Sequence, residues 1–465
     1  MRTSFRTAVS LVGLLCLAGV GAGLFLLPGL RVVADLRDPA LHTGGITQST
    51  RRWHAELTPR IEAWARARIT SGAAAGVALH DVPTTEWPLF TSVFYLMATD
   101  NLEAAWKDHP EPGQVEPLEA ARGAVSAARD LLIDPVHHTW VKTHWGPDYL
   151  HREDVFFRSL LIAGLTSYER LTGDGTAVPM LRDQVETLSS ALDASPLGVL
   201  HDYPGECYPI DVVAAIGFIR RADAVLDTDH RSFVARSLRG FVGPMADAHG
   251  LVPYLMDGDT GQQLGPSRGV GNSWVSVFAP DLWPEQAQDW YSRYEASFWQ
   301  ERLWADGFRE LARGTLRSEW MFDVDAGLVL DGFGTAATAF GIAAARRNGR
   351  LDHAYAMQAE AVAASWPLPN GTLLIPRLFS NGVDAPYLGE ASLLYMQTVT
   401  PAPGVSVVTG GHAPALVWIC LAIYFGVAIF IFTDVLVRGR KLLRRPRVQP
   451  ASVIDKALTP HASGA

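Results

Sequence analysis

Acid–base side chains are concentrated in one short stretch of the sequence, residues 201–211. The stretch holds a histidine, a cysteine, two tyrosines and the carboxylates Asp202, Glu206 and Asp211, and an apolar helix is expected directly after it. Two carboxyl groups at a pocket mouth can act as acid and base when burial separates their pKa values. The alternative is that Asp211 caps the following helix and that the rest is a solvated turn. We favour the chemical interpretation because so many acid–base residue types share one loop.

Two carboxylates of this loop flank a predicted tight turn. The Pro204-Gly205 pair favours a turn that directs Asp202 and Glu206 into one pocket. Like charges held a few ångströms apart resist ionising together, so one carboxyl group keeps its proton to higher pH. Asp202 and Glu206 are therefore the predicted acid and base. The loop residues predicted to assist them are His201, Cys207 and Tyr208, with Tyr203 as a substrate contact.

A second candidate segment, residues 140–149, combines two indole rings with a histidine and a carboxylate. Trp140, Trp145 and Asp148 are candidate substrate contacts, since aromatic rings stack on sugar faces or enclose apolar substrates. The alternative is a Trp-rich contact between helices. The neighbouring His137-His138 pair lacks a second spaced pair of ligands, so we predict no metal site.

Two further polar segments lie later in the chain. Residues 257–261 predict a tight turn, because their spacing and the missing terminal glutamate do not fit a calcium loop. Asp323 and Asp325 precede a helix rich in small residues, where they either cap that helix or face the mouth.

Helices must position these segments. Apolar residues recur at helical spacing over residues 51–69, 116–133, 154–171, 212–226, 230–245, 284–303, 333–347 and 353–366. Residues 373–378 are the best strand candidate. Ten to twelve helices without a fixed repeat favour an all-α fold, a closed α/α toroid of about six hairpins with an active site at one mouth.

Two uncharged, apolar segments lie near the ends of the chain. Residues 8–30 and 413–433 have the length that spans a bilayer as a helix. The predicted order is a cytoplasmic N-terminus (1–7), a span (8–30), a juxtamembrane segment with an amphipathic helix (31–75), the toroid domain (76–400), a linker (401–412), a span (413–433) and a basic cytoplasmic tail (434–465). The alternative for the first segment is a cleaved signal peptide, but no small-x-small site follows it.

The charge distribution indicates the orientation and excludes one class of partner. Arginine and lysine cluster directly after the second span, which places both termini in the cytoplasm and the domain outside it. The net charge of −9 includes this basic tail, so the domain is acidic and nucleic acid is not an expected partner. Cys207 is the only cysteine between the spans, so no disulfide forms inside the domain. The arginine-rich, lysine-poor composition favours a bacterial cytoplasmic membrane.

The order of these segments resembles the linalool dehydratase/isomerase family over about residues 92–395. The resemblance rests on residues 131–135 before Trp145-Gly146, on the helix of residues 153–173, on residues 198–202, and on Tyr254-Leu255, Gly261 and Trp274. It implies an α/α toroid of six hairpins and a cofactor-free dehydration and isomerisation of a small terpene alcohol.

The resemblance also suggests roles for single residues. Asp202 stands where the family has a functional glutamate, and His201 stands where it has a cysteine. Tyr254, an expected catalytic residue, and Tyr95, an expected substrate contact, match family tyrosines, and Trp274 is a further expected contact. The family's pocket histidine and second cysteine are replaced at or near Leu160 and Ile210.

The leading expectation is a membrane-anchored lyase or isomerase that needs no cofactor. A carbohydrate-active enzyme of the cell envelope is the second hypothesis, because helical toroids host many unrelated activities. A non-catalytic binding protein of the envelope is the third.

Overall fold

The computed structural model describes residues 2–110, 115–315 and 319–443, with the side chains of residues 2–7 outside the description. Helices make up 65% of the chain, and the described strands are all short. The structure therefore confirms a mostly helical protein.

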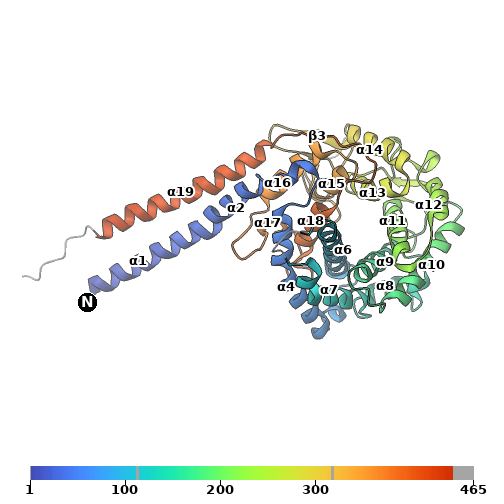
Figure 1. Ribbon diagram of the computed structural model, residues 1–465, viewed down its shortest axis with the longest axis horizontal. Coiled ribbons are helices and arrows are strands. Elements are labelled where there is room, and N and C mark those ends of the chain that lie inside the picture. Colours follow the sequence, from blue (N-terminus) through green and yellow to red (C-terminus); the bar gives the residue numbers. More distant parts are fainter. Residues whose placement is uncertain (1, 111–114, 316–318, 444–465) are drawn as a thin grey trace, which may run out of the picture.

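The two ends of the described chain form long apolar helices that lie side by side (Figure 1). α1 (Arg2–Gly21), the π-helical turn η1 (Ala22–Leu26) and α2 (Leu27–Asp35) follow one another without a break, and α19 (Ala415–Leu443) packs along them. Glycine allows this close approach, because a Cβ atom on Gly29 would lie 2.8 Å from the Tyr424 side chain. Both helices are long and apolar enough to cross a membrane; that they do so, and in which orientation, stays a prediction.

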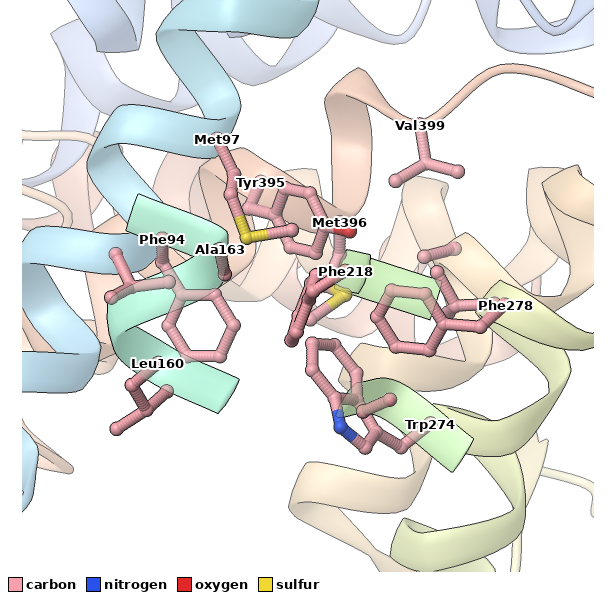
Figure 2. Close-up of a cluster of buried hydrophobic side chains, with 14 of the residues drawn as sticks. Phe94, Met97, Leu160, Ala163, Phe218, Trp274, Phe278, Tyr395, Met396 and Val399 are labelled. Atoms are coloured by element: carbon pink, nitrogen blue, oxygen red, sulfur yellow. The ribbon is translucent and has the colours of Figure 1, made fainter. Parts of the chain in front are cut away.

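Six helices of the described domain contact one another in a closed order. They are α6 (Trp87–Asp108), α9 (Val155–Thr172), α11 (Pro209–Leu226), α13 (Gly269–Leu282), α15 (Thr335–Arg347) and α18 (Leu388–Thr398). Each packs against the next, and α18 packs against α6, so that they surround a common centre (Figure 1). Phe94, Phe218, Trp274 and Tyr395 point toward one another there (Figure 2). We refer to these six as the inner helices.

A second set of helices packs outside the inner ones. α4 (Gln48–Ser71) and α7 (Pro117–Ile133) pack together, and α7 also contacts α6 and α9. The others are α10 (Val178–Ala194) against α9 and α11, α12 (Arg231–Ser237) against α10, α14 (Pro284–Phe298) against α13, and α16 (Leu351–Ala364) against α15 and α19.

Ion pairs and hydrogen bonds show that the inner helices end at one face of the domain. Asp100 near the end of α6 accepts from Arg170 of α9 at 2.9 Å and from Arg221 of α11. Arg347 of α15 pairs with Asp281 of α13, and the amide of Asn101 donates to Thr398 of α18 at 3.1 Å. The first turns of these helices therefore gather at the opposite face, which we call the N-terminal mouth.

Short elements fill the connections. The strands pair as three small antiparallel sheets, namely β1 (Leu255–Met256) with β2 (Gln263–Gly265), β3 (Trp299–Glu301) with β4 (Asp306–Phe308), and β5 (Met321–Asp323), β6 (Gly327–Leu330) and β7 (Phe333–Gly334) in that order. The short helices are α3 (Ala40–Thr43), η2 (Ala73–Gly76), α5 (Val82–Thr85), α8 (Thr139–Trp145), η3 (Tyr149–His151), η4 (Leu238–Gly240), η5 (Gly243–Met245) and α17 (Leu374–Leu378).

Three predicted elements differ from the structure. The strand prediction for residues 373–378 is wrong, because α17 forms there after the Leu373 amide donates to the buried Glu390 carboxylate at 3.0 Å. The helix predicted over residues 284–303 stops at Phe298, where the chain turns into β3. The helix predicted over residues 230–245 is broken after Ser237 into η4 and η5, at Gly240 and at Gly243-Pro244.

Candidate active site

The loop before α11 forms the predicted turn and ends in a cap. The amide of Glu206 donates to the carbonyl of Tyr203 at 2.9 Å, and Gly205 between them has a φ of +85°, which glycine adopts without strain. Asp202 Oδ2 accepts the amide of Tyr208, the N-cap residue of α11, at 2.6 Å. Asp211 lies in the first helical turn and makes no capping bond. Asp202, rather than Asp211, therefore closes the end of α11.

Asp202 and Asp211 form a pair of carboxyl groups, of which Asp202 is buried and Asp211 is partly buried. Asp202 has no exposed surface, and burial together with the charges of Asp211 and Asp154 raises its pKa well above the usual range. Burial, followed by the nearby Asp325, raises the pKa of Asp211 to about 7. At neutral pH this pair therefore holds at least one proton, which is what an acid–base pair requires.

Glu206 lies apart from this pair. Its side chain is exposed and accepts a hydrogen bond from the Tyr208 hydroxyl at 3.1 Å. The turn forms as predicted, but it directs Asp202 inward and Glu206 to the rim. Among the described residues, the carboxyl partner of Asp202 within this segment is Asp211.

Glu86 is a member of the site that the sequence analysis missed. It is buried at the N-cap position of α6, and the Tyr203 hydroxyl donates to its Oε1. Burial, opposed by this hydrogen bond and reinforced by Asp325 and Asp211, raises its pKa to about 8. Nothing local marks this glutamate in the sequence, since it precedes Tyr203 by 117 residues.

Asp154 is a second missed carboxylate. It is buried at the N-cap of α9 with a left-handed φ of +31°, an unfavourable conformation for a side-chain-bearing residue. Burial raises its pKa well above the usual range, although Arg158 opposes the shift. The next residue, Val155, donates its amide to the carbonyl of His201 at 3.1 Å, so α9 begins directly against the loop.

His201 is held in place by a neighbouring glutamate, and Cys207 is buried. His201 is held by Glu153, whose Oε2 lies 2.6 Å from Nδ1 and accepts the His201 amide at 2.8 Å. The Cys207 thiol is fully buried, and burial, followed by the charges of Asp202 and Asp211, raises its pKa. The thiol is therefore neutral near pH 7 and is a poor nucleophile.

The segment of Asp323 and Asp325 meets this loop from the other side of the mouth. The Tyr254 hydroxyl donates to Asp325, and the rings of Tyr254 and Tyr208 lie 5.3 Å apart. Burial, followed by the charge of Asp325, raises the pKa of Tyr254, and burial raises the pKa of Asp325. The prediction that these two segments converge is confirmed.

One arginine organises this side of the mouth. Arg268 lies 3.1 Å from Asp323, 2.5 Å from the buried Glu310 and 4.4 Å above the centre of the Tyr254 ring. Although burial raises the pKa of Asp323, Arg268 holds it below the usual value. The guanidinium is thus already bound by two carboxylates and does not neutralise Asp202 or Asp211.

The 140–149 segment reaches the mouth only in part. The rings of Trp140 and His144 lie 6.3 and 5.6 Å from that of Tyr203, so the first half of the segment converges as predicted. Trp145 is half-buried, and Asp148 is exposed and pairs with His151 at 3.0 Å. No group of three metal-ligating side chains suited to an ion occurs among the described residues.

Aromatic side chains form a floor beneath the carboxylates. Tyr203 stacks on Phe156 at 6.4 Å, Phe156 contacts Phe90 at 5.2 Å, and Phe90 stacks on Phe94 at 5.4 Å. Trp274 continues the series toward the centre of the domain, 6.0 Å from Phe94 (Figure 2). We call this series the aromatic floor.

Tyr95 lies outside the mouth. Its hydroxyl bonds Thr58 of α4 at 2.8 Å, and its ring stacks on His54 of the same helix. The adjacent Phe94 points to the centre instead, because successive residues of a helix face different directions. Tyr95 therefore faces the outer helix α4, away from the loop of residues 201–211.

A cleft of about 410 Å³ lies at the opposite face, near the last turns of α6, α9 and α11. Its charges are paired within the protein: Glu103 lies 3.2 Å from Lys107, and Arg170 binds Asp100. Its Glu169 carboxylate accepts the amides of Gly175 and Ala177. We therefore place the candidate active site at the N-terminal mouth, where Glu86, Asp202 and Asp211 form no ion pair with a basic side chain of the described residues.

Comparisons with known proteins leave the family open. No protein-family model matches the chain, and none of the curated proteins compared is significantly similar to it.

Proposed function

We propose that the central domain is an α/α toroid whose N-terminal mouth is the active site of a cofactor-independent lyase or isomerase. The closed contact order of the inner helices, with outer helices packed against them, supports the toroid. The carboxyl cluster supports the chemistry. Burial raises the pKa values of Glu86, Asp202 and Asp211, and the charges of Asp211 and Asp325 add to these shifts, which keeps protons on carboxyl groups near pH 7.

The proposed reaction removes water from a small alcohol. A protonated carboxyl group gives its proton to the substrate hydroxyl. The C–O bond then breaks, water leaves, and the carbon is left with a positive charge. An ionised carboxylate then takes a proton from the neighbouring carbon, and the electrons of that C–H bond form the double bond. Asp211 is the proposed contact with substrate, because it is only partly buried, whereas Asp202 has no exposed surface and caps α11.

The aromatic floor favours an apolar substrate and its cationic intermediate. The faces of aromatic rings attract positive charge, and this attraction strengthens where water is excluded. Phe94 and Trp274 are almost fully buried beneath the mouth, with exposed fractions of 3% and 9%. A terpenoid-like alcohol, with an apolar body and one hydroxyl, fits carboxyl groups above such a floor.

A carbohydrate substrate is the second candidate. Trp320 and Phe322 beside Asp323 have exposed fractions of 65% and 73%, and exposed rings at a mouth can stack on sugars. Glycosidases also use paired carboxyl groups, one as an acid and one as a base or nucleophile.

A substrate screen with the purified full chain distinguishes these proposals. We expect loss of water from, or isomerisation of, terpenoid alcohols, detected as new products by gas chromatography and mass spectrometry. Cleavage of envelope glycans without any alcohol turnover would favour the carbohydrate proposal. Activity on neither class would contradict both and favour a binding protein.

A further inference from the structure

The domain contacts the two terminal helices at residues that lie well inside them, not only where the helices join the domain. The Trp366 indole donates to the carbonyl of Leu24 at 2.7 Å, and its ring lies 4.2 Å from that of Tyr424. The Tyr424 hydroxyl donates to the carbonyl of Ala363, which belongs to α16, at 3.0 Å. Leu24 and Tyr424 lie inside the uncharged runs of their helices, so the contact lies at the level of the predicted spans.

If α19 spans the membrane, its length places the Tyr424 contact inside the hydrocarbon core. From Tyr424 to Asp434, the first charged residue of α19, the helix rises about 15 Å at 1.5 Å per residue. A hydrocarbon core is about 30 Å thick. About half of the core along α19 must therefore lie on the domain side of Tyr424, where α16 and Trp366 pack.

The faces of α19 that are turned away from the domain are apolar, as expected if they lie in lipid. Val417 and Cys420 of α19 are buried, whereas Trp418, Ile419 and Ile423 are exposed by 63%, 48% and 43%. A large apolar surface of this kind is stable against acyl chains but costly in water.

A loop of the domain extends this apolar surface. Leu378, Phe379 and Val383, which follow Trp366 in the chain, have exposed fractions of 68%, 45% and 84%. Figure 1 shows α17 and the orange loop after it beside α2, on the side from which the terminal helices extend. We call residues 378–383 the apolar loop.

The segment that leads to the apolar loop is held beside α2 and α4, and Asn381 of the loop donates its side-chain amide to the carbonyl of Pro83 in α5 at 3.3 Å. Arg31 of α2 donates to the carbonyl of Leu368 at 2.7 Å, and Arg60 of α4 donates to that of Asn370 at 2.6 Å. The one basic residue of α17, Arg377, turns inward, where it lies 2.7 Å from Glu390 and 4.3 Å above the Tyr387 ring. Its charge is thus neutralised by the protein, while its apolar neighbours face outward.

We propose that the apolar loop inserts into the leaflet on the domain's side of the membrane. The domain then has three contacts with the bilayer, namely two spanning helices and one interfacial loop. The occupant of this surface is bilayer lipid, because the loop lies on the side of the domain from which the two apolar helices extend (Figure 1) and residues 378–383 include no charged side chain. The proposal rests on the terminal helices spanning the membrane.

Spin-label accessibility in lipid vesicles tests the proposal with the full chain. Cys16→Ser removes the exposed thiol of α1, and the remaining cysteines are buried. In that background, a label on Val383→Cys is compared with a label on Leu264→Cys, an exposed position (54%) of β2. In phosphatidylcholine and phosphatidylglycerol vesicles, we expect the Val383 label to collide more with oxygen, which concentrates in lipid, and the Leu264 label to collide more with a water-soluble nickel chelate.

Three results would overturn the proposal. Equal preference of both labels for the nickel chelate would place the loop in water. Low accessibility of the Val383 label to both reagents would indicate a second protein copy instead of lipid. A label on the native Cys16 that prefers the nickel chelate would remove the span and this proposal together, so failure of the premise is distinguishable from failure of the loop. None of these three outcomes affects the active-site proposal.

Discussion

Glu86 illustrates how a single buried carboxyl group links proton binding to stability. Its pKa of about 8 in the folded protein lies above the value of about 4.5 expected when it is exposed, mainly because burial disfavours its charge. Its protonated form is therefore favoured by folding. The stability that this gives is complete below about pH 4.5 and is lost as the pH rises through about 8.

We predict that Glu86→Gln removes part of the pH dependence of unfolding. Glutamine still accepts the Tyr203 hydroxyl bond but cannot ionise. Between pH 4.5 and 8 the unfolding temperature of the unaltered protein should fall relative to that of the variant, by the equivalent of up to about 5 kcal/mol. Differential scanning fluorimetry over this pH range checks the prediction. Parallel curves for the two proteins would contradict it and would place an ionised Glu86 in the folded state.

The residues of the site differ in how far the sequence could reveal them. Asp202 and Asp211 could be predicted because they share a short loop crowded with acid–base side chains. Glu86 and Asp154 could not, because they come from the starts of α6 and α9 and join the loop only through the fold. The turn at Pro204-Gly205 follows from local chemistry, but the opposite directions of Asp202 and Glu206 depend on the packing of α9 and α11.

At the scale of elements, the long amphipathic helices were the most predictable. α9 lies within one residue of its predicted bounds, since its apolar face is regular and Gly173 ends it in a left-handed conformation. The predicted helix ranges did not include α6, α10, α13 or α18. For α13 the reason is local, because Gly269 and Gly271 open it and favour a loop prediction. Its glycines have a packing reason: a Cβ atom on Gly269 would lie 1.8 Å from the carbonyl oxygen of Arg309.

Asp202 has two roles in this account, because it caps α11 and belongs to the carboxyl cluster of the candidate site. We predict that Asp202→Asn changes the free energy of unfolding by less than about 1 kcal/mol, since the asparagine oxygen still accepts the Tyr208 amide. Asp202→Ala should cost about 1–3 kcal/mol, because the amide loses its partner. Thermal unfolding of both variants is the measurement. Asp193→Asn, which alters an exposed ion pair with Arg236, is the control and should be nearly neutral. Equal losses in both Asp202 variants would show that the carboxylate charge, rather than the capping bond, stabilises the loop.

At the scale of the whole molecule, the apolar ends were predictable because membrane spans have a strong compositional signal. The packing of the domain along these helices was not predictable, because it depends on single contacts such as that of Trp366 with Leu24. The ring-like order of the inner helices was expected from helix number and from a family resemblance, not from any local pattern.

The orientation of the chain gives a prediction at this scale. The basic residues at the end of α19, among them Arg438, Arg440 and Lys441, favour a cytoplasmic C-terminus. A reporter enzyme that is active only outside the cytoplasm should be active when fused after Thr409. It should be inactive when fused after Thr459, which lies outside the described residues. The reverse pattern would contradict the argument from charge.

The central claim is that the carboxyl cluster of the N-terminal mouth carries the chemistry, and turnover by Asp211→Asn tests it most directly. On the best substrate of the screen, the full-chain Asp211→Asn variant should lose at least about 100-fold in kcat, in the range expected for loss of an acid–base group. Asp193→Asn should keep full turnover, and both variants should unfold at nearly the same temperature as the unaltered protein. Full turnover by Asp211→Asn would contradict the account and would move the chemistry away from this cluster.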